Sequence, residues 1–167
     1  MYKYIASGII FLCICYVGYS LKSMYRKKYN FYCDFSLFNQ KLLDEINNYK
    51  TPIVKVIEKY IAENQNYVAK VLEAYKQNLQ NNIIYVENSK EVIPKALFLA
   101  KDEVSFVINY LDNLGKTDFD TQVIFLKRHI TEFEQKKNNS KVEMDKKGDL
   151  YFKLSIMLGF SIILIMI

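Results

Sequence analysis

The chain contains few residues that interrupt regular structure: five Gly and two Pro among 167 residues. Because these residues mark turns and breaks, their scarcity favours helices over strands almost throughout. Histidine occurs once and cysteine three times, and two of the cysteines lie inside an apolar run. Such a sequence lacks both the ligand cluster of a metal site and the cysteine framework of a disulfide-rich fold.

The sequence offers little for catalysis. The glycines form no phosphate-binding loop, and His129 stands beside Arg128 with no second histidine or cysteine nearby. We expect His129 to lie on a solvated helix face. Acids that occur in pairs are expected to cap helices or face solvent rather than to act as general acids and bases. We therefore predict a protein that is not an enzyme and that binds no cofactor, metal, nucleic acid or small-molecule substrate.

Both ends of the chain are apolar. Tyr4–Leu21 carries no charge, and a helix of about 18 residues, rising about 1.5 Å per residue, nearly spans a hydrocarbon core of roughly 30 Å. A signal peptide is the alternative, but bulky residues occupy the region of the required cleavage site. Leu154–Ile167 is also uncharged, and it extends to Leu150 if Lys153 reaches the headgroups. A buried terminal helix is the alternative there, but Ile162–Ile167 is apolar on every face, which favours lipid.

The positive charges beside these runs predict an orientation. Four basic residues at 22–28 follow the first run and six lysines at 136–153 precede the second, whereas only Lys3 lies on the other side. By the positive-inside rule the middle segment is cytoplasmic and both termini lie across the membrane. Anionic lipid headgroups attract such cations, so the formal charge of +5 does not require a nucleic-acid partner.

The middle of the chain is predicted to be an all-α bundle of about six helices. Apolar residues recur every three or four positions, the spacing of one helical face. The predicted parts are a transmembrane anchor at 1–21, a cytoplasmic helical bundle domain at 22–149 and a second transmembrane anchor at 150–167. The first helix is expected to run on from its anchor, and the last to continue into the second anchor with Gly148 as its weak point. The first apolar face comprises Phe35, Phe38, Leu42, Ile46 and Tyr49, and the last comprises Phe119, Val123, Leu126, Ile130 and Phe133.

Capping residues predict two turns. Thr51 is expected at the N-cap of a helix that has Pro52 as its first residue. Gly115 fits a helix end, because positive φ costs glycine little, and Thr117-x-x-Asp120 resembles a capping box. A tight reversal between two helices is therefore expected at this point.

The second anchor carries two small residues four positions apart, Ser155 and Gly159. Small residues allow another helix to approach closely, so we predict a helix-packing site in the membrane. The first anchor has no matching four-residue pair of glycines, and a simple anchor is therefore the alternative.

Three stretches share their order and spacing with a known family. They are LDEINNYKTPI at 43–53, LDNLGKTDFDTQ at 111–122 and LYFKLSIMLGFSIILIMI at 150–167. Over essentially its whole length the chain resembles the stage III sporulation protein AB family of endospore-forming bacteria. It departs from the family pattern at Ser155, where glycine is usual, and at 89–97, where a tryptophan is often found.

The resemblance implies a fold and a function. The family's middle domain is similar to the inner-membrane platform proteins of type II secretion and type IV pilus systems. The chain is then expected to be a non-enzymatic platform or scaffold subunit of the secretion-like transenvelope channel complex, in the mother-cell membrane that faces the forespore. Its expected partners are membrane lipid and that complex's cytoplasmic ATPase and polytopic membrane subunits.

We predict two regions of the domain as the docking surface for these partners; in the alternative, they only shape the fold. The reversal contributes Leu114, Gly115, Lys116, Asp118, Asp120 and Gln122, and a helix corner contributes Glu45, Tyr49 and Pro52. Two other function classes stay open. One is an independent membrane-tethered structural or envelope protein without a secretion partner. The other is a membrane-damaging protein, which does not need the large folded domain predicted here.

Overall fold

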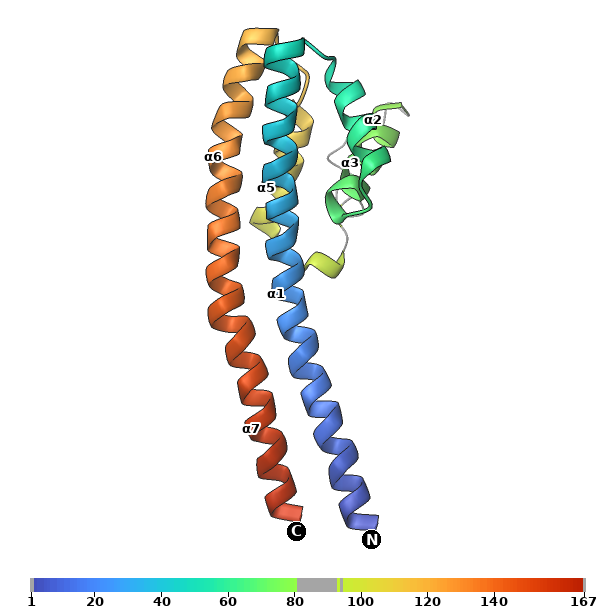
Figure 1. The fold of residues 1–167 in the computed structure, drawn as a ribbon, viewed down its shortest axis with the longest axis vertical. Coiled ribbons are helices and arrows are strands. Elements are labelled where there is room, and N and C mark those ends of the chain that lie inside the picture. The colour runs from blue at the N-terminus through green and yellow to red at the C-terminus, as the bar shows by residue number, and fades with distance from the viewer. Residues whose placement is uncertain (1, 81–92, 94, 167) are drawn as a thin grey trace. The chain divides into compact units, whose positions relative to one another are not determined.

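The structure, a computed structural model, describes residues 2–80, 93 and 95–166. Most of these residues are helical and none of them forms a strand, which confirms the all-α prediction (Figure 1). Most of 89–97, the segment without the family's tryptophan, lies outside them. The elements are α1 (Tyr2–Tyr49), α2 (Ile53–Glu63), α3 (Tyr67–Gln80), a 3₁₀ turn (Lys95–Leu97), α5 (Lys101–Asn113), α6 (Phe119–Glu143), a π-helical turn (Met144–Gly148) and α7 (Asp149–Met166).

The chain divides into two compact units. The two-helix unit comprises Met1–Tyr29 and Asn138–Ile167, and the multi-helix unit comprises Asn30–Lys137. Both α1 and α6 supply residues to each unit. The expected continuation of the first helix beyond its apolar run is thus confirmed. The borders predicted after residues 21 and 149 concern a membrane, and they stay predictions.

Two antiparallel helices form the two-helix unit. The ring centroids of Phe11 and Phe160 lie 5.2 Å apart, and those of Tyr25 and Tyr151 lie 6.2 Å apart. Residue numbers therefore rise along α1 as they fall along α7. No loop separates α6 from α7, because the π-helical turn joins them and ends at Gly148, the predicted weak point.

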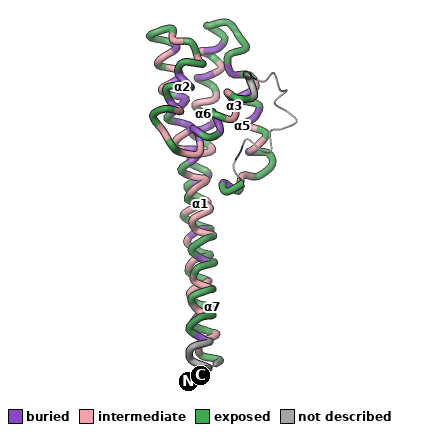
Figure 2. Tube along the Cα trace, turned by 90° about the vertical axis from the view of Figure 1, so that its right-hand side faces the viewer, coloured by how far each residue is buried: buried purple, intermediate pink, exposed green. Residues whose placement is uncertain are grey.

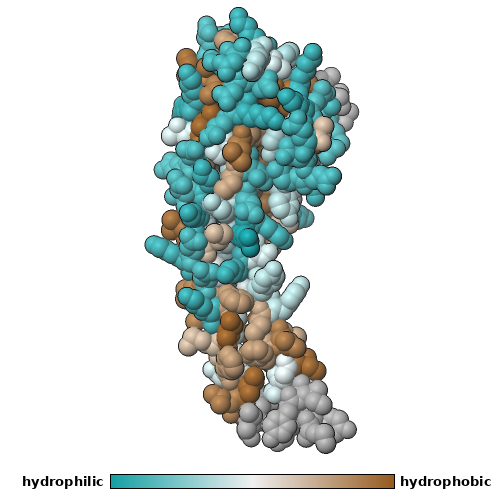
Figure 3. Space-filling view, in the orientation of Figure 1, coloured by the Kyte–Doolittle hydropathy of each residue, from teal (hydrophilic) through white to brown (hydrophobic). Residues whose placement is uncertain are grey.

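This unit holds most of the chain's exposed apolar surface. Two helical runs, Ser7–Tyr49 and Phe119–Ile165, each contain a stretch that is long and apolar enough to cross a membrane, and only 11% of each stretch is buried within the chain. Figure 2 shows the unit as mostly exposed and intermediate, and Figure 3 shows apolar side chains gathered on its described part. The chain's own core therefore does not cover these residues.

An aromatic cluster forms the core of the multi-helix unit. Phe35 of α1 and Phe133 of α6 stack with ring centroids 4.4 Å apart, and the ring of Tyr110 of α5 meets both edge-on. All three side chains are fully buried. Helix α2 joins the core through Tyr60, which packs edge-on against Phe38 at 4.9 Å. The core thus ties together helices that are distant in sequence.

Helix α1 ends differently from the sequence-based expectation. Lys50 adopts a positive φ of 51°, and the Thr51 amide donates to the Glu45 carbonyl oxygen at 3.2 Å. The Lys50 amide also donates to the Ile46 carbonyl oxygen at 3.1 Å, and such a bond from a residue of positive φ is the pattern of an αL motif at a helix C-terminus. Pro52, not Thr51, occupies the N-cap of α2, which has no side-chain capping bond. The prediction was wrong by one residue, because the Thr51 hydroxyl donates instead to the Glu45 carboxylate at 3.1 Å.

His129 does not lie on a solvated face. Its side chain is only 17% exposed, and its ring packs against Phe125 at 4.3 Å and Tyr110 at 5.2 Å. Its Nδ1 lies 2.8 Å from a Glu132 carboxylate oxygen. Burial lowers the pKa of His129, although Glu132 opposes this shift. The polar neighbours in sequence misled the prediction, because the i−4 residue is the aromatic Phe125.

We expect acidification to destabilise the protein through His129. An unfolded histidine takes up a proton near pH 6.5, whereas the folded state takes it up only at lower pH. The unfolded state therefore binds more protons below about pH 6.5, so the free energy of unfolding falls with pH in that range and is unaffected by this residue above it. Urea unfolding at pH 7.5 and 5.5 should show a smaller pH effect in His129→Gln than in the wild type. Equal effects would contradict the assignment.

Candidate docking site at one end of the multi-helix unit

The two regions predicted to dock partners lie at the same end of the multi-helix unit. A Cβ atom placed on Gly115 would lie 3.5 Å from Cδ1 of Ile53, so the reversal touches the start of α2. Figure 1 shows the end of α1 and the start of α6 at this end of the unit. We call the residues 45–54 and 114–122 the tip. Its two parts are far apart in sequence and form one surface region.

The reversal at the tip is fixed by buried side chains. Gly115 has a φ of +80°, which favours glycine. The Gln122 side-chain oxygen accepts hydrogen bonds from the Gly115 amide at 3.1 Å and the Thr117 hydroxyl at 3.0 Å. Leu114 and Gln122 are 4% and 3% exposed. Because they are buried, they hold the loop in shape and are not accessible to a partner.

Helix α3 also supports the reversal. The Tyr75 hydroxyl donates to the Leu114 carbonyl oxygen at 3.3 Å in a buried position. Burial raises the pKa of Tyr75 to about 12, and the negative charge of Asp112 adds to the effect. Tyr75 therefore keeps its proton and remains a donor near neutral pH.

Asp118 caps α6, one residue later than the predicted capping box. Its carboxylate accepts a hydrogen bond from the Thr121 amide at 3.2 Å. Hydrogen bonds from Thr121, first from its side chain and then from its amide, lower the pKa of Asp118. Thr117 does not cap the helix, because its hydroxyl binds Gln122 instead. Lys116, Asp118 and Asp120 are all exposed, which leaves them accessible to a partner.

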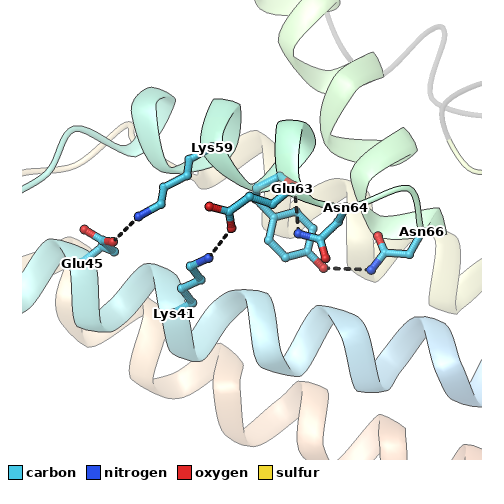
Figure 4. Close-up of polar contacts among 7 residues, drawn as sticks. Lys41, Glu45, Lys59, Glu63, Asn64 and Asn66 are labelled. Atoms are coloured by element: carbon cyan, nitrogen blue, oxygen red, sulfur yellow. Dashed lines mark hydrogen bonds and ion pairs between the residues drawn. The ribbon is translucent and has the colours of Figure 1, made fainter.

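The corner at the end of α1 contains one residue that supports the fold and two that are accessible to a partner. The Glu45 carboxylate accepts from the Thr51 hydroxyl. It also lies 3.5 Å from the Lys59 ammonium (Figure 4), so it ties α1 to α2. Tyr49, by contrast, is 75% exposed. Pro52 is also exposed. Tyr49 and Pro52 can therefore touch a partner without rearrangement of the fold.

Further contacts hold the end of α2 and the start of α3 in place. Figure 4 shows Lys41 of α1 bonded to Glu63 at 2.8 Å and Asn66 bonded to the Tyr60 hydroxyl at 3.0 Å. Asn66 also accepts from the Ala69 amide at 2.9 Å, which caps α3. The tip is therefore built on helices whose ends are tied to one another.

Sequence reasoning missed two accessible apolar residues of the tip. Phe119 was assigned to the buried face of the last helix, but its side chain is 41% exposed. Val54 was not singled out, and it is 53% exposed. The position of Phe119 as the first residue of α6 was the available signal, because no preceding turn covers it. With Tyr49 these residues give the tip an apolar component among its charges.

The small residues of α7 pack against α1 within the two-helix unit. A Cβ atom placed on Gly18 would lie 2.5 Å from Cβ of Ser155, and one placed on Gly159 would lie 2.6 Å from the Phe11 ring. Both positions therefore need small residues for close approach. A single glycine, Gly18, faces Ser155 although the first run lacks a four-residue pair of glycines. The helix that approaches these residues closely belongs to the same chain, and helix packing within a membrane stays a prediction.

The described residues contain no group of three or more His, Cys, Asp or Glu side chains placed to hold a metal ion.

Comparison with known proteins gave one family. The family model for stage III sporulation protein AB matches residues 3–167. No curated protein and no solved structure matches the chain.

Proposed function

The chain belongs to the stage III sporulation protein AB family, and from this premise we propose that it is a platform subunit of the secretion-like channel complex between mother cell and forespore. It is a sporulation-related protein by its family. In this proposal it acts by binding and not as an enzyme. Its helical bundle is similar to platform proteins of type II secretion and lies in the mother-cell cytoplasm, while two transmembrane helices hold it in the membrane that faces the forespore.

The exposed apolar stretches support the membrane part of the proposal. They lie in two helical runs and are 11% buried within the chain, so water would meet them in a soluble protein. Basic residues at 22–28 and 136–153 border them on the side of the multi-helix unit in sequence. Moving that side across a bilayer is disfavoured by the positive-inside rule. Two anchors would also raise the concentration of the domain beside other membrane subunits.

The tip carries the docking part of the proposal. Two separate sequence regions meet there on a loop that Gln122 and Tyr75 hold in place. A surface held in shape before binding loses little conformational entropy when a partner docks. The tip combines an exposed aromatic residue, Tyr49, with exposed charges on Lys116 and Asp120. The proposed partner here is the complex's cytoplasmic ATPase, while the anchors meet its polytopic membrane subunits.

Replacing Lys116 and Asp120 together with alanine should weaken association with the ATPase. Both side chains are exposed, so the fold should keep its helicity by circular dichroism. Loss of a hot-spot pair costs at least about 2 kcal/mol, so co-purification from sporulating cells should fall roughly tenfold or more. The control replaces Lys127 and Asp102, an exposed pair of the same charges away from the tip. Unchanged co-purification of the tip variant would exclude this loop as the docking site.

An independent membrane tether is the competing function. It predicts that cross-linking in sporulating cells attaches neither an ATPase nor polytopic membrane subunits to this chain. It also predicts a gene neighbourhood without those components. The accessible tip favours the platform, because a tether has no use for a preformed contact surface.

A further inference from the structure

The net positive charge of the chain lies in the unit that carries the apolar stretches. The two-helix unit contains nine Lys and Arg residues but only three Asp and Glu residues. The multi-helix unit contains 14 basic and 15 acidic residues. The net charge of +5 therefore arises from the two-helix unit alone.

Part of this charge is used to hold the two helices together. The Lys22 ammonium lies 2.8 Å from the Asp149 carboxylate, and the Lys28 ammonium lies 2.9 Å from that of Glu143. Lys147 also binds Glu143, at 3.1 Å. The hydrogen bond from Lys28, with a smaller contribution from Lys147, lowers the pKa of Glu143. These three lysines already have carboxylate partners.

Three other cations have no such partner among the described residues. Arg26 and Lys146 are exposed and Lys27 is half-buried. The ion pairs Lys22–Asp149 and Lys28–Glu143 align residues 22–28 of α1 with residues 143–149. The three cations fall inside these two ranges, so they lie at similar heights along the antiparallel pair. The π-helical turn adds one acid, Asp145, at the same height. The level therefore keeps a net positive charge.

These cations lie at the outer edge of the headgroup layer, and their long side chains can reach back to the lipid phosphates. Arg26 follows the end of the uncharged run at Leu21 by five residues, which is about 7.5 Å along a helix. The headgroup layer extends roughly 5–7 Å beyond the hydrocarbon core on each side. The stacked rings of Tyr25 and Tyr151 lie beside this level, and tyrosine is typical of the membrane interface.

We propose that Arg26, Lys27 and Lys146 form a binding collar for anionic phospholipid in the membrane that holds the protein. Each cation binds a headgroup phosphate, and the planar guanidinium of Arg26 can donate two parallel hydrogen bonds to one phosphate. The collar rests on the proposed insertion into a membrane. It adds a preference for one lipid class, which neither the family nor the tip implies.

The test uses the full chain in liposomes of phosphatidylcholine with spin-labelled phosphatidylglycerol or phosphatidylcholine as the probe. The wild type should prefer phosphatidylglycerol, and added salt should reduce the preference. In the variant Arg26→Gln, Lys27→Gln, Lys146→Gln the preference for phosphatidylglycerol should be weaker by a factor of at least about five, which is the contribution of roughly one surface cation. The control replaces Lys55, Lys101 and Lys127 with glutamine. These three lysines are exposed and belong to the multi-helix unit. Their replacement lowers the net charge by the same amount as the test variant, and it should leave the lipid preference intact.

Separate outcomes identify a failure of the collar and a failure of membrane insertion. If wild type and variants resist carbonate extraction but share one lipid preference, the collar is overturned while the platform proposal stands. If soluble glycerol phosphate at millimolar concentration abolishes the preference, the site takes free phosphate and the lipid collar is likewise overturned. Extraction of the wild type by carbonate would overturn both proposals.

Discussion

Replacing Phe133 with alanine is expected to lower the free energy of unfolding of the multi-helix unit by about 3–5 kcal/mol. The Phe133 ring is fully buried and stacks on Phe35 at 4.4 Å. It also contacts the rings of Tyr110 at 5.2 Å and Phe106 at 4.9 Å, both in α5. Its removal would leave a cavity where α1, α5 and α6 meet, and the surrounding rings cannot fill it without leaving their own contacts.

Urea unfolding of the full chain in detergent, followed by circular dichroism, measures this loss. The matched control is Ile124→Ala in the same helix, where the side chain is 69% exposed. That change removes an apolar group without opening a cavity, so its effect should stay within about 0.5 kcal/mol. Equal destabilisation by the two substitutions would mean that the aromatic cluster is not the core of this unit.

The helical faces could be predicted from sequence because burial follows the helix period. The face predicted for α1 includes Phe35, Phe38, Leu42 and Ile46, and all four are buried. Tyr49 continues the same spacing but is 75% exposed. The period identifies a face, but it does not say where the neighbouring helices stop covering it. The end of α1 at Tyr49 is what leaves this ring in solvent.

The tip could be predicted only in its parts. Gly115 and the neighbouring polar residues predicted the reversal, because a positive φ and a helix cap are local properties. The contact between the reversal and Ile53 depends on how three helices pack, which no local pattern encodes. The same limit explains the caps at Thr51 and Thr117. Each hydroxyl had a second acceptor, supplied by Glu45 or Gln122, and the folded geometry favoured it.

The second large effect is expected in the two-helix unit, where Gly159→Leu should separate the helices. Any Cβ at this position would lie 2.6 Å from the Phe11 ring, and the ring is itself packed against Phe160 at 5.2 Å. Overpacking of this kind costs about 1–3 kcal/mol. A cost of about 1.4 kcal/mol already reduces the closed population of a marginal pair roughly tenfold.

Disulfide cross-linking can report this separation. Cysteines introduced by Tyr25→Cys and Tyr151→Cys occupy positions whose rings stack at 6.2 Å, after Cys13, Cys15 and Cys33 have been replaced by serine. Oxidation should join the two helices in this background, and Gly159→Leu should slow the reaction roughly tenfold. Ser161→Leu is the matched control, because it places the same side chain on an exposed position of α7 and should not slow it. If both leucine variants cross-link as fast as the parent, the close approach at Gly159 does not hold the helices together, and Ser155 with Gly18 would have to do so alone.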